Sequence, residues 1–280
     1  MNVRREAARR LAEAGVPSPD FDADELLAHV LGTTRPGLAV APEPTPEQRQ
    51  LYDVLVARRA AREPLQHLTG SAAFRHVELA VGPGVFVPRP ETELLAGWAV
   101  ERAAEVRDAG RTPVVVDLCT GSGAIALSVA TEVPEAVVHA VELGESAVAW
   151  ADRNLAGSGV DLRQGDMADA FPELDGGVDV VVANPPYIPL DAYESVAPEA
   201  RDHDPLLALF SGDDGLDAMR VVERVAARLL RASGWVGAEH ADMQGESAPA
   251  VFSQAGRWAD VRDHDDLAGR SRFVTARLAR

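Results

Sequence analysis

The sequence has one cysteine, no lysine and no long apolar run, and two of these shortages exclude a class of structure. A single cysteine, Cys119, excludes an internal disulfide framework and a cysteine-based metal cluster. No apolar stretch approaches the roughly 20 residues that a membrane-spanning helix needs. The absence of lysine is a composition bias from which we draw no function. The seven histidines show no metal-ligand spacing, so we expect no metal site.

Positive charge is also scarce. The chain has 44 acidic and 27 basic residues, which gives a formal net charge of -17. A phosphate backbone repels such a chain unless a local basic patch exists, so a protein or small-molecule substrate is favoured over nucleic acid. The arginine-rich stretch 1–15 has a helical pattern, but Glu6, Glu13 and the lack of an apolar core count against a targeting peptide. We expect a cytoplasmic protein without membrane contact.

Residues 1–70 have a helical pattern and contain no chemical motif. Thr45-Pro46-Glu47 is typical of a helix cap followed by proline in the first turn. In residues 71–92 the apolar residues alternate instead, which predicts a linking β-hairpin. We place its turn at Gly82-Pro83-Gly84 and its second strand at Val85–Val87. Apolar residues at roughly helical spacing are Leu11, Phe21, Leu26, Leu27, Val30 and Leu31.

Residues 93–280 alternate apolar strands with helical stretches, the pattern of an α/β domain with a parallel sheet. The connection 188–215 lacks clear periodicity, and a connection this long beside a candidate site favours a substrate-binding lid. The predicted strands are Val114–Leu118, Val137–Glu142, Val160–Gln164, Val178–Ala183, Trp235–Glu239, Trp258–Arg262 and Arg272–Ala276.

Asn184-Pro185-Pro186-Tyr187 is the most informative stretch of the chain. It follows the run 178–183, whose β-branched residues are typical of a buried parallel strand. Two prolines stop the strand and restrict the residue before each of them to extended geometry. The resulting stiff turn presents a carboxamide, free backbone carbonyls and an aromatic ring. Such a turn suits a planar N–H donor, such as an amide or an amino-heterocycle.

A second motif, residues 114–126, consists of a strand, a glycine loop and the start of a helix. Gly121, Gly123 and Ala126 even fit the dinucleotide-binding pattern. However, Asp117 at the strand end disfavours a pyrophosphate and suits a ligand with a cationic amino-acid portion. Cys119 has no clear base or orienting partner, so we interpret it as loop packing.

Acidic residues end the next two predicted strands as well. Glu142 stands where an acid typically binds ribose hydroxyls, and Asp166 ends the third strand. With Asp117 they outline a ligand site at the carboxyl edge of the sheet. S-adenosylmethionine fits this site, because it combines a sulfonium, an ammonium, a ribose and an adenine. Asp166 would accept from the adenine amino group, and Met167 would pack on the ring and offer its backbone N–H.

Together these motifs resemble the HemK/PrmC-type peptide chain release factor N5-glutamine methyltransferases. The Asn-Pro-Pro-Tyr element alone is shared with DNA amino-methyltransferases, whereas Pro88–Glu93 and Asp266–Arg270 make the resemblance specific. The resemblance runs along most of the chain. Its other stretches are Pro64–Gly70, Phe74, Asp117–Ala126, Gly212–Leu216, Gln244 and Ser271–Arg272.

The resemblance implies a helical substrate-docking domain at 1–70, a hairpin linker at 71–92 and a methyltransferase domain at 93–280. That domain would have the class I S-adenosylmethionine-dependent fold, with a seven-stranded, mostly parallel sheet. The implied reaction is methylation of the glutamine in the Gly-Gly-Gln motif of release factors. The implied cofactor contacts are Cys119, Thr120, Gly121, Ser122, Gly123, Glu142, Met167 and Asn184, and Asn184, Pro185, Pro186 and Tyr187 would hold the glutamine.

Two positions depart from the family pattern. Glu142 stands where the family often has aspartate, which would shift the ribose geometry slightly. Glu239-His240-Ala241 stands where a Glu-Ile-Gly-like segment is expected, so that stretch carries little weight.

A carboxamide nitrogen is a poor nucleophile, because its lone pair is delocalised. We expect catalysis by orientation, in which the Asn184 side-chain oxygen and the Pro185 carbonyl accept the two N–H bonds while Tyr187 packs on the amide. Three alternatives stay open. An adenine-N6 or guanine-N2 methyltransferase of nucleic acid is disfavoured by the acidity. A non-catalytic adaptor is disfavoured by the intact motifs, and a nicotinamide oxidoreductase is disfavoured by Asp117 and the proline turn.

Overall fold

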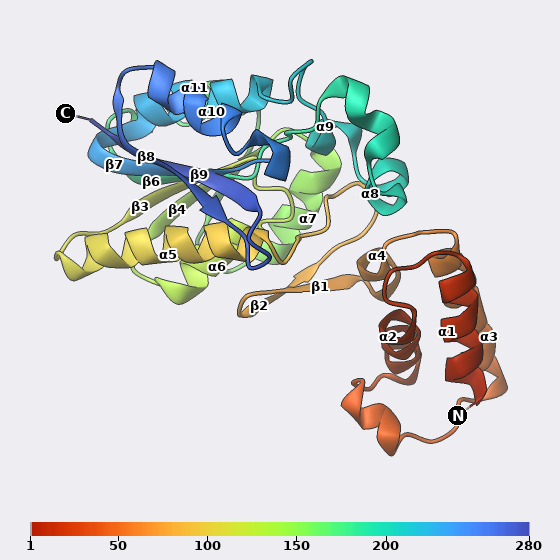
Figure 1. Ribbon diagram of the computed structural model, residues 1–280. Helices are drawn as coiled ribbons and strands as arrows, with labels where there is room; N and C mark the ends of the chain where they lie inside the picture. Colours follow the sequence, from red (N-terminus) through yellow and green to blue (C-terminus); the bar gives the residue numbers. More distant parts are fainter. Residues whose placement is uncertain (1, 280) are drawn as a thin grey trace. The chain divides into compact units, whose positions relative to one another are not determined.

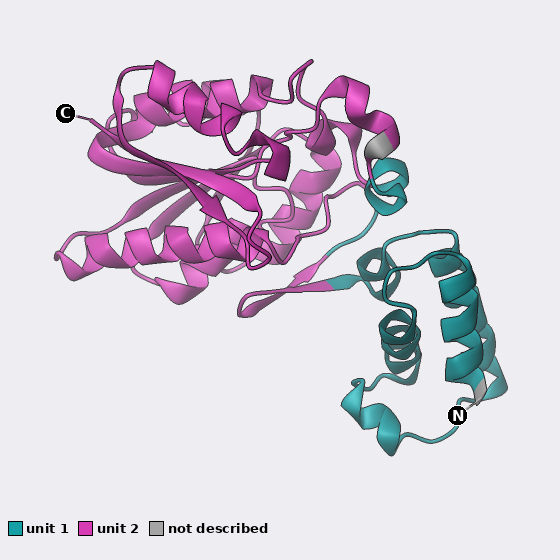
Figure 2. Cartoon of the chain, viewed as in Figure 1, with its two compact units in different colours: residues 1–71, 81–83, 197–203 teal, residues 72–80, 84–196, 204–280 magenta. Residues whose placement is uncertain are grey.

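The computed structural model describes residues 2–279, which form two compact units (Figure 2). Unit 1 runs up to Ser71 and adds Val81–Pro83 and Ala197–His203. Unit 2 comprises Ala72–Ala80, Gly84–Val196 and the chain from Asp204 onward. Within the described residues, no helix is long and apolar enough to cross a membrane.

Unit 1 is a small helical bundle around one apolar core. Leu11, Leu26, Tyr52 and Val56 are fully buried in it, and the Tyr52 hydroxyl donates to the Ala23 carbonyl (2.9 Å). Thr45 caps a helix in a reciprocal capping box with Gln48, so the predicted cap is confirmed. The helices are α1 (Asn2–Glu13), α2 (Pro19–Leu31), α3 (Pro46–Ala60) and α4 (Leu65–Thr69), with a 3-10 turn η1 (Pro36–Ala39).

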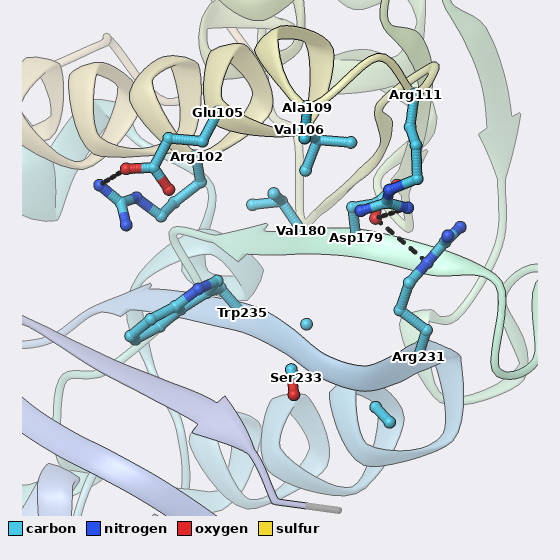
Figure 3. A pocket seen from close by; sticks show the side chains of 12 residues that line it. Arg102, Glu105, Val106, Ala109, Arg111, Asp179, Val180, Arg231, Ser233 and Trp235 are labelled. Atoms are coloured by element: carbon cyan, nitrogen blue, oxygen red, sulfur yellow. Dashed lines mark hydrogen bonds and ion pairs between the residues drawn. The ribbon is translucent and has the colours of Figure 1, made fainter.

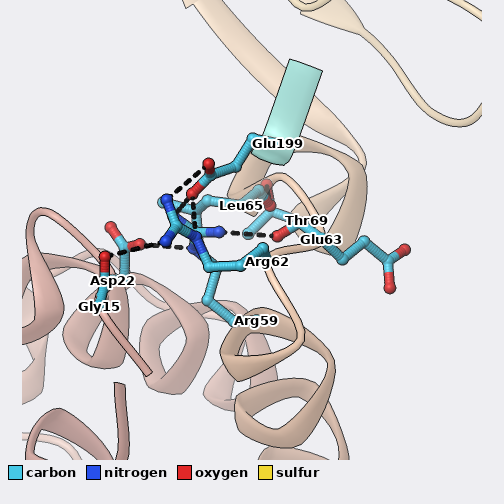
Figure 4. A network of polar contacts seen from close by, with 8 residues as sticks. All are labelled: Gly15, Asp22, Arg59, Arg62, Glu63, Leu65, Thr69 and Glu199. Carbon is cyan, nitrogen blue, oxygen red and sulfur yellow. Dashed lines mark hydrogen bonds and ion pairs between the residues drawn. The ribbon is translucent and has the colours of Figure 1, made fainter. Parts of the chain in front are cut away.

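A helix from far along the chain completes unit 1. Glu199 in α8 (Pro198–His203) accepts two hydrogen bonds from Arg62 (both 2.7 Å) and one from Arg59 (3.0 Å). Arg59 is nearly buried and also donates to Asp22 (2.7 Å), as Figure 4 shows. Burial alone would raise the pKa of Glu199, but the two arginines outweigh it and hold the pKa at about 2. The ion cluster therefore fastens residues 197–203 to the helices.

A two-stranded hairpin follows the helices, with its turn in a different place from the prediction. Its strands are β1 (Ser71–Phe74) and β2 (Val77–Ala80), so the predicted turn at Gly82–Gly84 and the strand at Val85–Val87 are wrong. Arg75 makes the tight turn with φ 48°, a conformation that arginine rarely adopts. Its guanidinium binds both oxygens of Glu132 (2.7 Å each), which stabilises it there. Pro83, which has no N–H to donate, interrupts the chain before 85–87.

Unit 2 contains the seven-stranded sheet, in the order β5-β4-β3-β6-β7-β9-β8 (Figure 1). The first five of these are parallel, and β9 and β8 are antiparallel to their neighbours. All seven predicted strands are confirmed. Their bounds are β3 (Val114–Leu118), β4 (Val137–Glu142), β5 (Asp161–Gln164), β6 (Val178–Ala183), β7 (Leu230–Glu239), β8 (Trp258–Asp265) and β9 (Ser271–Leu278).

Helices cover both faces of this sheet (Figure 1). On one face lie α5 (Thr92–Asp108) and α6 (Ala124–Glu132), and on the other lie α10 (Asp217–Leu229) and α11 (Ser247–Gln254). The helix α7 (Glu145–Leu155) connects β4 to β5. Because both faces are covered, every residue of the central strand β6 is buried. This architecture is the predicted seven-stranded α/β fold.

The segment 188–215 contains short helices, and residues near its two ends are hydrogen-bonded to each other. Ile188 forms a parallel bridge with Phe210, and its N–H donates to the Leu209 carbonyl (2.8 Å). Between them lie η4 (Leu190–Ser195), α8 and α9 (Leu206–Leu209). A role for this segment as a substrate lid stays a prediction.

Candidate active site

The predicted site residues meet at one edge of the sheet. From β3 the chain runs outward to β4 and β5, and it then crosses back to β6 on the other side of β3. The topological switch point therefore lies between β3 and β6. Leu118 pairs with Val141 on one neighbour and with Ala183 on the other, and Glu142 pairs with Gln164. These four strands therefore end level with one another. Ligands of open α/β sheets bind at such a switch point, outside the carboxyl ends of the strands.

Asp117 organises the glycine loop from inside the protein. Its side chain is fully buried, and Oδ2 accepts hydrogen bonds from the Thr120 hydroxyl (2.6 Å) and the Ala126 N–H (3.1 Å). Burial raises the pKa of Asp117 to about 7 even though both bonds favour the ionised form. Among the described residues, Oδ1 has no hydrogen-bond partner. One oxygen therefore shapes the loop, and the other stays free for a donor.

The loop itself depends on left-handed backbone conformations. Cys119, Gly121 and Gly123 have φ values of 60°, 57° and 86°. A Cβ at Gly123 would lie 3.0 Å from Leu155, whereas a Cβ at Gly121 would meet no atom within 4 Å. Gly123 therefore packs against α7, and Gly121 borders open space where a ligand can approach the backbone.

Cys119 belongs to the packing of this loop. Its Sγ lies 3.5 Å from Met167 Sδ in η2 (Met167–Asp169), so the two predicted cofactor contacts touch each other. Burial, reinforced by Glu142 and Asp117, raises the pKa of the Cys119 thiol. The thiol is therefore protonated at neutral pH, as the loop-packing interpretation requires.

Glu142 connects the loop to the end of β4. Its Oε2 accepts from the Gly121 N–H (2.9 Å) and its Oε1 accepts from the Gly144 N–H (2.8 Å). Asp166 is exposed beyond β5, and its Oδ1 caps η2 by accepting from the Ala168 N–H (2.9 Å). Each carboxylate oxygen that accepts one backbone N–H keeps a lone pair for a ligand hydroxyl or amino group.

The proline turn is held by a hydrogen-bonded chain of side chains. The Asn184 Nδ2 donates to Thr92 Oγ1 (3.2 Å), and Thr92 Oγ1 donates to Glu239 Oε2 (2.7 Å). The Tyr187 hydroxyl donates to the other oxygen, Glu239 Oε1 (3.3 Å). Glu239 is buried, and burial raises its pKa to about 7. Burial also raises the pKa of Tyr187, with the nearby Glu239 charge adding to the effect.

The backbone of the turn is held as well. Gln244, at the end of η5 (Asp242–Gln244), donates from Nε2 to the carbonyls of Tyr187 (3.0 Å) and Asp214 (3.3 Å). Gly215 packs directly against the turn, since a Cβ there would lie 2.3 Å from the Tyr187 carbonyl oxygen. The matching stretch Gly212–Leu216 thus has a physical reason to contain this glycine.

Sequence reasoning did not assign Thr92, Glu239, Gln244 or Gly215 to the site. Glu239 had the clearest signal, because it ends a buried strand just as Glu142 does. The expectation that the segment Glu239-His240-Ala241 is uninformative is wrong for Glu239, which accepts hydrogen bonds from Thr92 and Tyr187. His240 is fully buried and bonds Asp263 (2.9 Å) and the Ala241 carbonyl (2.8 Å), so it supports the strand end.

A pocket of about 200 Å³ lies at the opposite ends of β6 and β7 and contains none of the predicted site residues (Figure 3). Within it, the buried Asp179 pairs with Arg111 (2.9 Å) and Arg231 (3.1 Å). Asp179 also accepts from the Val114 N–H (3.0 Å). These contacts join the beginnings of β3, β6 and β7, so we interpret them as structural.

Comparison with known proteins identifies the family. The PrmC N-terminal domain family matches residues 2–70, and the methyltransferase small domain family matches residues 103–197. A release factor glutamine methyltransferase of Streptomyces coelicolor is 60% identical over 98% of this chain and 96% of its own. The chain belongs to the release factor glutamine methyltransferase family. A second relative with that description, from Mycolicibacterium smegmatis, is 48% identical over 98% of this chain and 96% of its own.

Not every relative of this methyltransferase has the same description. A protein of Streptomyces pristinaespiralis described as a 4-amino-L-phenylalanine/4-methylamino-L-phenylalanine methyltransferase is 43% identical, over 91% of this chain and 87% of its own. Membership of the family confirms the predicted resemblance, the fold class, the methyltransferase activity and the cofactor S-adenosylmethionine. The residues that bind cofactor and substrate stay predictions, although the structure gathers them at one sheet edge.

Proposed function

We propose that this methyltransferase transfers a methyl group to the side-chain nitrogen of the glutamine in the Gly-Gly-Gln motif of peptide chain release factors. The observation that carries the proposal is the fixed amide of Asn184 at the end of β6. Its nitrogen is used by Thr92, while its oxygen accepts no hydrogen bond from the described residues. That oxygen is therefore available to a substrate N–H. The high identity to two release factor glutamine methyltransferases supports the same reaction.

The chain's part in this reaction is to position the amide. The Asn184 oxygen and the Pro185 carbonyl accept the two N–H bonds of the glutamine amide, which turns the nitrogen lone pair toward the methyl donor. The Tyr187 ring packs against the flat amide, and its hydroxyl is occupied by Glu239. Proton loss follows methyl transfer, so no strong base is required. Orientation and preorganised acceptors supply the rate enhancement.

The proposed cofactor contacts are those gathered around the glycine loop. The free Asp117 Oδ1 and the open space at Gly121 fit a ligand that brings a cationic donor. Glu142 would hold the ribose, and Asp166 and Met167 would hold the adenine. The other proposed contacts are Cys119, Thr120, Ser122, Gly123 and Asn184. Bound S-adenosylmethionine supplies an electrophilic methyl group on its sulfonium.

Calorimetry on a Glu142→Ala variant tests this assignment. The substitution removes the ribose acceptor and the partner of two loop N–H groups. We expect the cofactor to bind more weakly by roughly 1–3 kcal/mol, the loss typical of a hydrogen bond to a charged group. Glu145→Ala, an exposed acid three residues away, is the control. Equal cofactor affinity in both variants would contradict the proposed role of Glu142.

The substrate is tested with a release factor in its native form and with the Gly-Gly-Gln glutamine replaced. Methylation should be present in the first and absent in the second. The relative with an aminophenylalanine substrate makes an arylamine the second candidate, because an arylamine also presents a planar N–H₂ group. Turnover of 4-amino-L-phenylalanine but not of the release factor would favour that candidate.

We also propose that the helical domain formed by residues 1–70 docks the protein substrate. We propose further that residues 188–215 cover the bound substrate. Support comes from the match of residues 2–70 to a separate domain family, and from the lack of a catalytic motif in the sequence of residues 1–70. The test compares a whole release factor with a short Gly-Gly-Gln peptide on the intact chain. The whole factor should have a much lower KM. Equal kcat/KM for the two would show that no docking surface contributes.

A further inference from the structure

The direction of the hydrogen bonds from Glu239 to Asn184 is determined by the chemistry of the groups. An ionised carboxylate has no proton, so at 2.7 Å from Glu239 Oε2 the Thr92 hydroxyl must be the donor. A hydroxyl has one proton, so Thr92 Oγ1 then has only lone pairs to offer to Asn184. The group that faces it at 3.2 Å must therefore be the Asn184 N–H₂.

We propose that Thr92 and Glu239 are positioning residues that hold the Asn184 amide with its oxygen toward the substrate. This inference rests on the proposed function for its substrate, but the geometry is independent of it. If the amide were reversed, its N–H₂ would face the N–H₂ of the substrate amide. Two donors cannot bond each other, so the reversed amide is inactive. Neither residue touches the reacting atoms in this account.

Burial raises the pKa of Glu239 to about 7, and two neighbours favour its ionised form, which predominates above that pH. Arg272 on β9 supplies positive charge, and the Tyr187 hydroxyl donates to Oε1. Glu91, which precedes α5, opposes ionisation. Thr92 begins α5 while Glu239 ends β7, so the chain of bonds also joins a helix on one face to the end of the sheet. If Glu239 were protonated, it would donate to Thr92 Oγ1. The Thr92 hydroxyl could then donate its own proton to the Asn184 side-chain oxygen, which requires the reversed amide.

The test uses Thr92→Val, which keeps the side-chain shape and removes the hydroxyl, and Thr92→Ser, which keeps the hydroxyl. With release factor as substrate, we expect Thr92→Val to lower kcat about 10- to 100-fold, the usual loss when a partner of a contacting residue is removed. KM and cofactor affinity should stay within about twofold, and Thr92→Ser should restore most of kcat. Thr131→Val, at an exposed position of α6, is the matched control. Wild-type turnover by Thr92→Val, or equal losses in Val and Ser variants, would overturn the inference.

A second readout does not depend on the substrate. The chain has three asparagines, Asn2, Asn154 and Asn184, so selective ¹⁵N-asparagine labelling gives three side-chain N–H₂ signals. Asn184→Ala identifies the Asn184 signal, and Asn154, which donates to two carbonyls, is an internal reference. We expect the Asn184 signal to shift and exchange faster with water in Thr92→Val and in Glu239→Gln. An unchanged Asn184 signal would overturn the inference. This readout still applies if the wild type methylates no release factor, a separate result that would refute the proposed function.

Discussion

Two buried carboxyl groups at the site respond to pH near neutrality, one on each side of the reaction. Asp117 lies under the glycine loop and Glu239 lies behind the proline turn. Burial raises both pKa values to about 7. A raised carboxyl pKa favours the neutral form in the folded state. Ionisation of these groups therefore reduces stability as pH rises from about 4.5 to about 7.

The first prediction is a rate that rises with pH through about 7. The ionised form of Glu239 fixes Asn184, so kcat should increase as Glu239 loses its proton. The proposed role of Asp117 is in cofactor binding, so saturating cofactor should remove its contribution to the measured rate. Glu239→Gln should have a low kcat without this rise. A wild-type kcat that is flat between pH 6 and 8, or the same rise in Glu239→Gln, would show that Glu239 does not control the rate.

The second prediction concerns Asn184 itself. Asn184→Ala should lower the rate of methyl transfer by about 10²–10³, the usual loss for one preorganised polar contact. Asn184→Asp keeps an acceptor oxygen but loses the N–H₂ that bonds Thr92, so partial activity is expected. Single-turnover reactions with a release factor measure both. Wild-type rates in Asn184→Ala would remove the mechanism proposed here.

Sequence patterns located the strand ends of the site but not the side chains behind them. Alternation and β-branched runs report burial, which is why β3, β4 and β6 were predicted with their observed bounds. Thr92 and Glu239 are 147 residues apart, and nothing local marks them as a pair. The turn at Arg75 was missed for a related reason. A distant carboxylate, Glu132, stabilises a backbone conformation that the local sequence disfavours.

At the scale of elements, the loop 212–216 and the turn after β6 support each other. Gln244 reaches the carbonyls of both Tyr187 and Asp214, and Ser211 accepts a hydrogen bond from the Ala218 N–H (2.8 Å) at the start of α10. Within this loop, Gly215 lies directly against the Tyr187 carbonyl, where a side chain would not fit. The family motif at 212–216 matters here for its shape, since its chemistry is not used in the proposed reaction.

The third prediction separates shape from backbone strain at Gly215. Gly215→Ala and Gly157→Ala both force alanine to a φ near 76°, which costs about 1–2 kcal/mol. At Gly157 the new Cβ meets no atom within 4 Å, but at Gly215 it would lie 2.3 Å from the Tyr187 carbonyl. Both variants should therefore lose stability, and only Gly215→Ala should also lose methyl transfer. Thermal melts and single-turnover rates measure the two effects, and full activity in Gly215→Ala would contradict the argument.

At the scale of the whole molecule, three separate segments of the chain contribute to unit 1. The helices end near Thr69, and residues 197–203 return to them from the middle of the segment 188–215. Glu199 connects residues 197–203 to the helices, because its carboxylate forms ion pairs with both Arg59 and Arg62. Arg59 has only 7% of its side chain exposed, so loss of a partner leaves a poorly hydrated cation.

The last prediction follows from the low pKa of Glu199. A carboxyl group whose folded pKa is about 2 stabilises the folded state above its ordinary value near 4.5, and this contribution is lost as pH falls toward 2. Glu199→Gln should lose about 2–3 kcal/mol at pH 7, the scale of one charged hydrogen-bond partner. Hydrogen exchange in peptides that cover residues 197–203 should rise, whereas the control Glu135→Gln, an exposed acid, should leave it unchanged.

Thermal melts followed by circular dichroism test the role of the charge. The difference in melting temperature between wild type and Glu199→Gln should shrink from pH 4.5 toward pH 2. All four tryptophans lie in unit 2, so their fluorescence should change little in this variant at pH 7. A difference that is the same at pH 7 and at pH 2.5 would show that the Glu199 charge does not hold the segment.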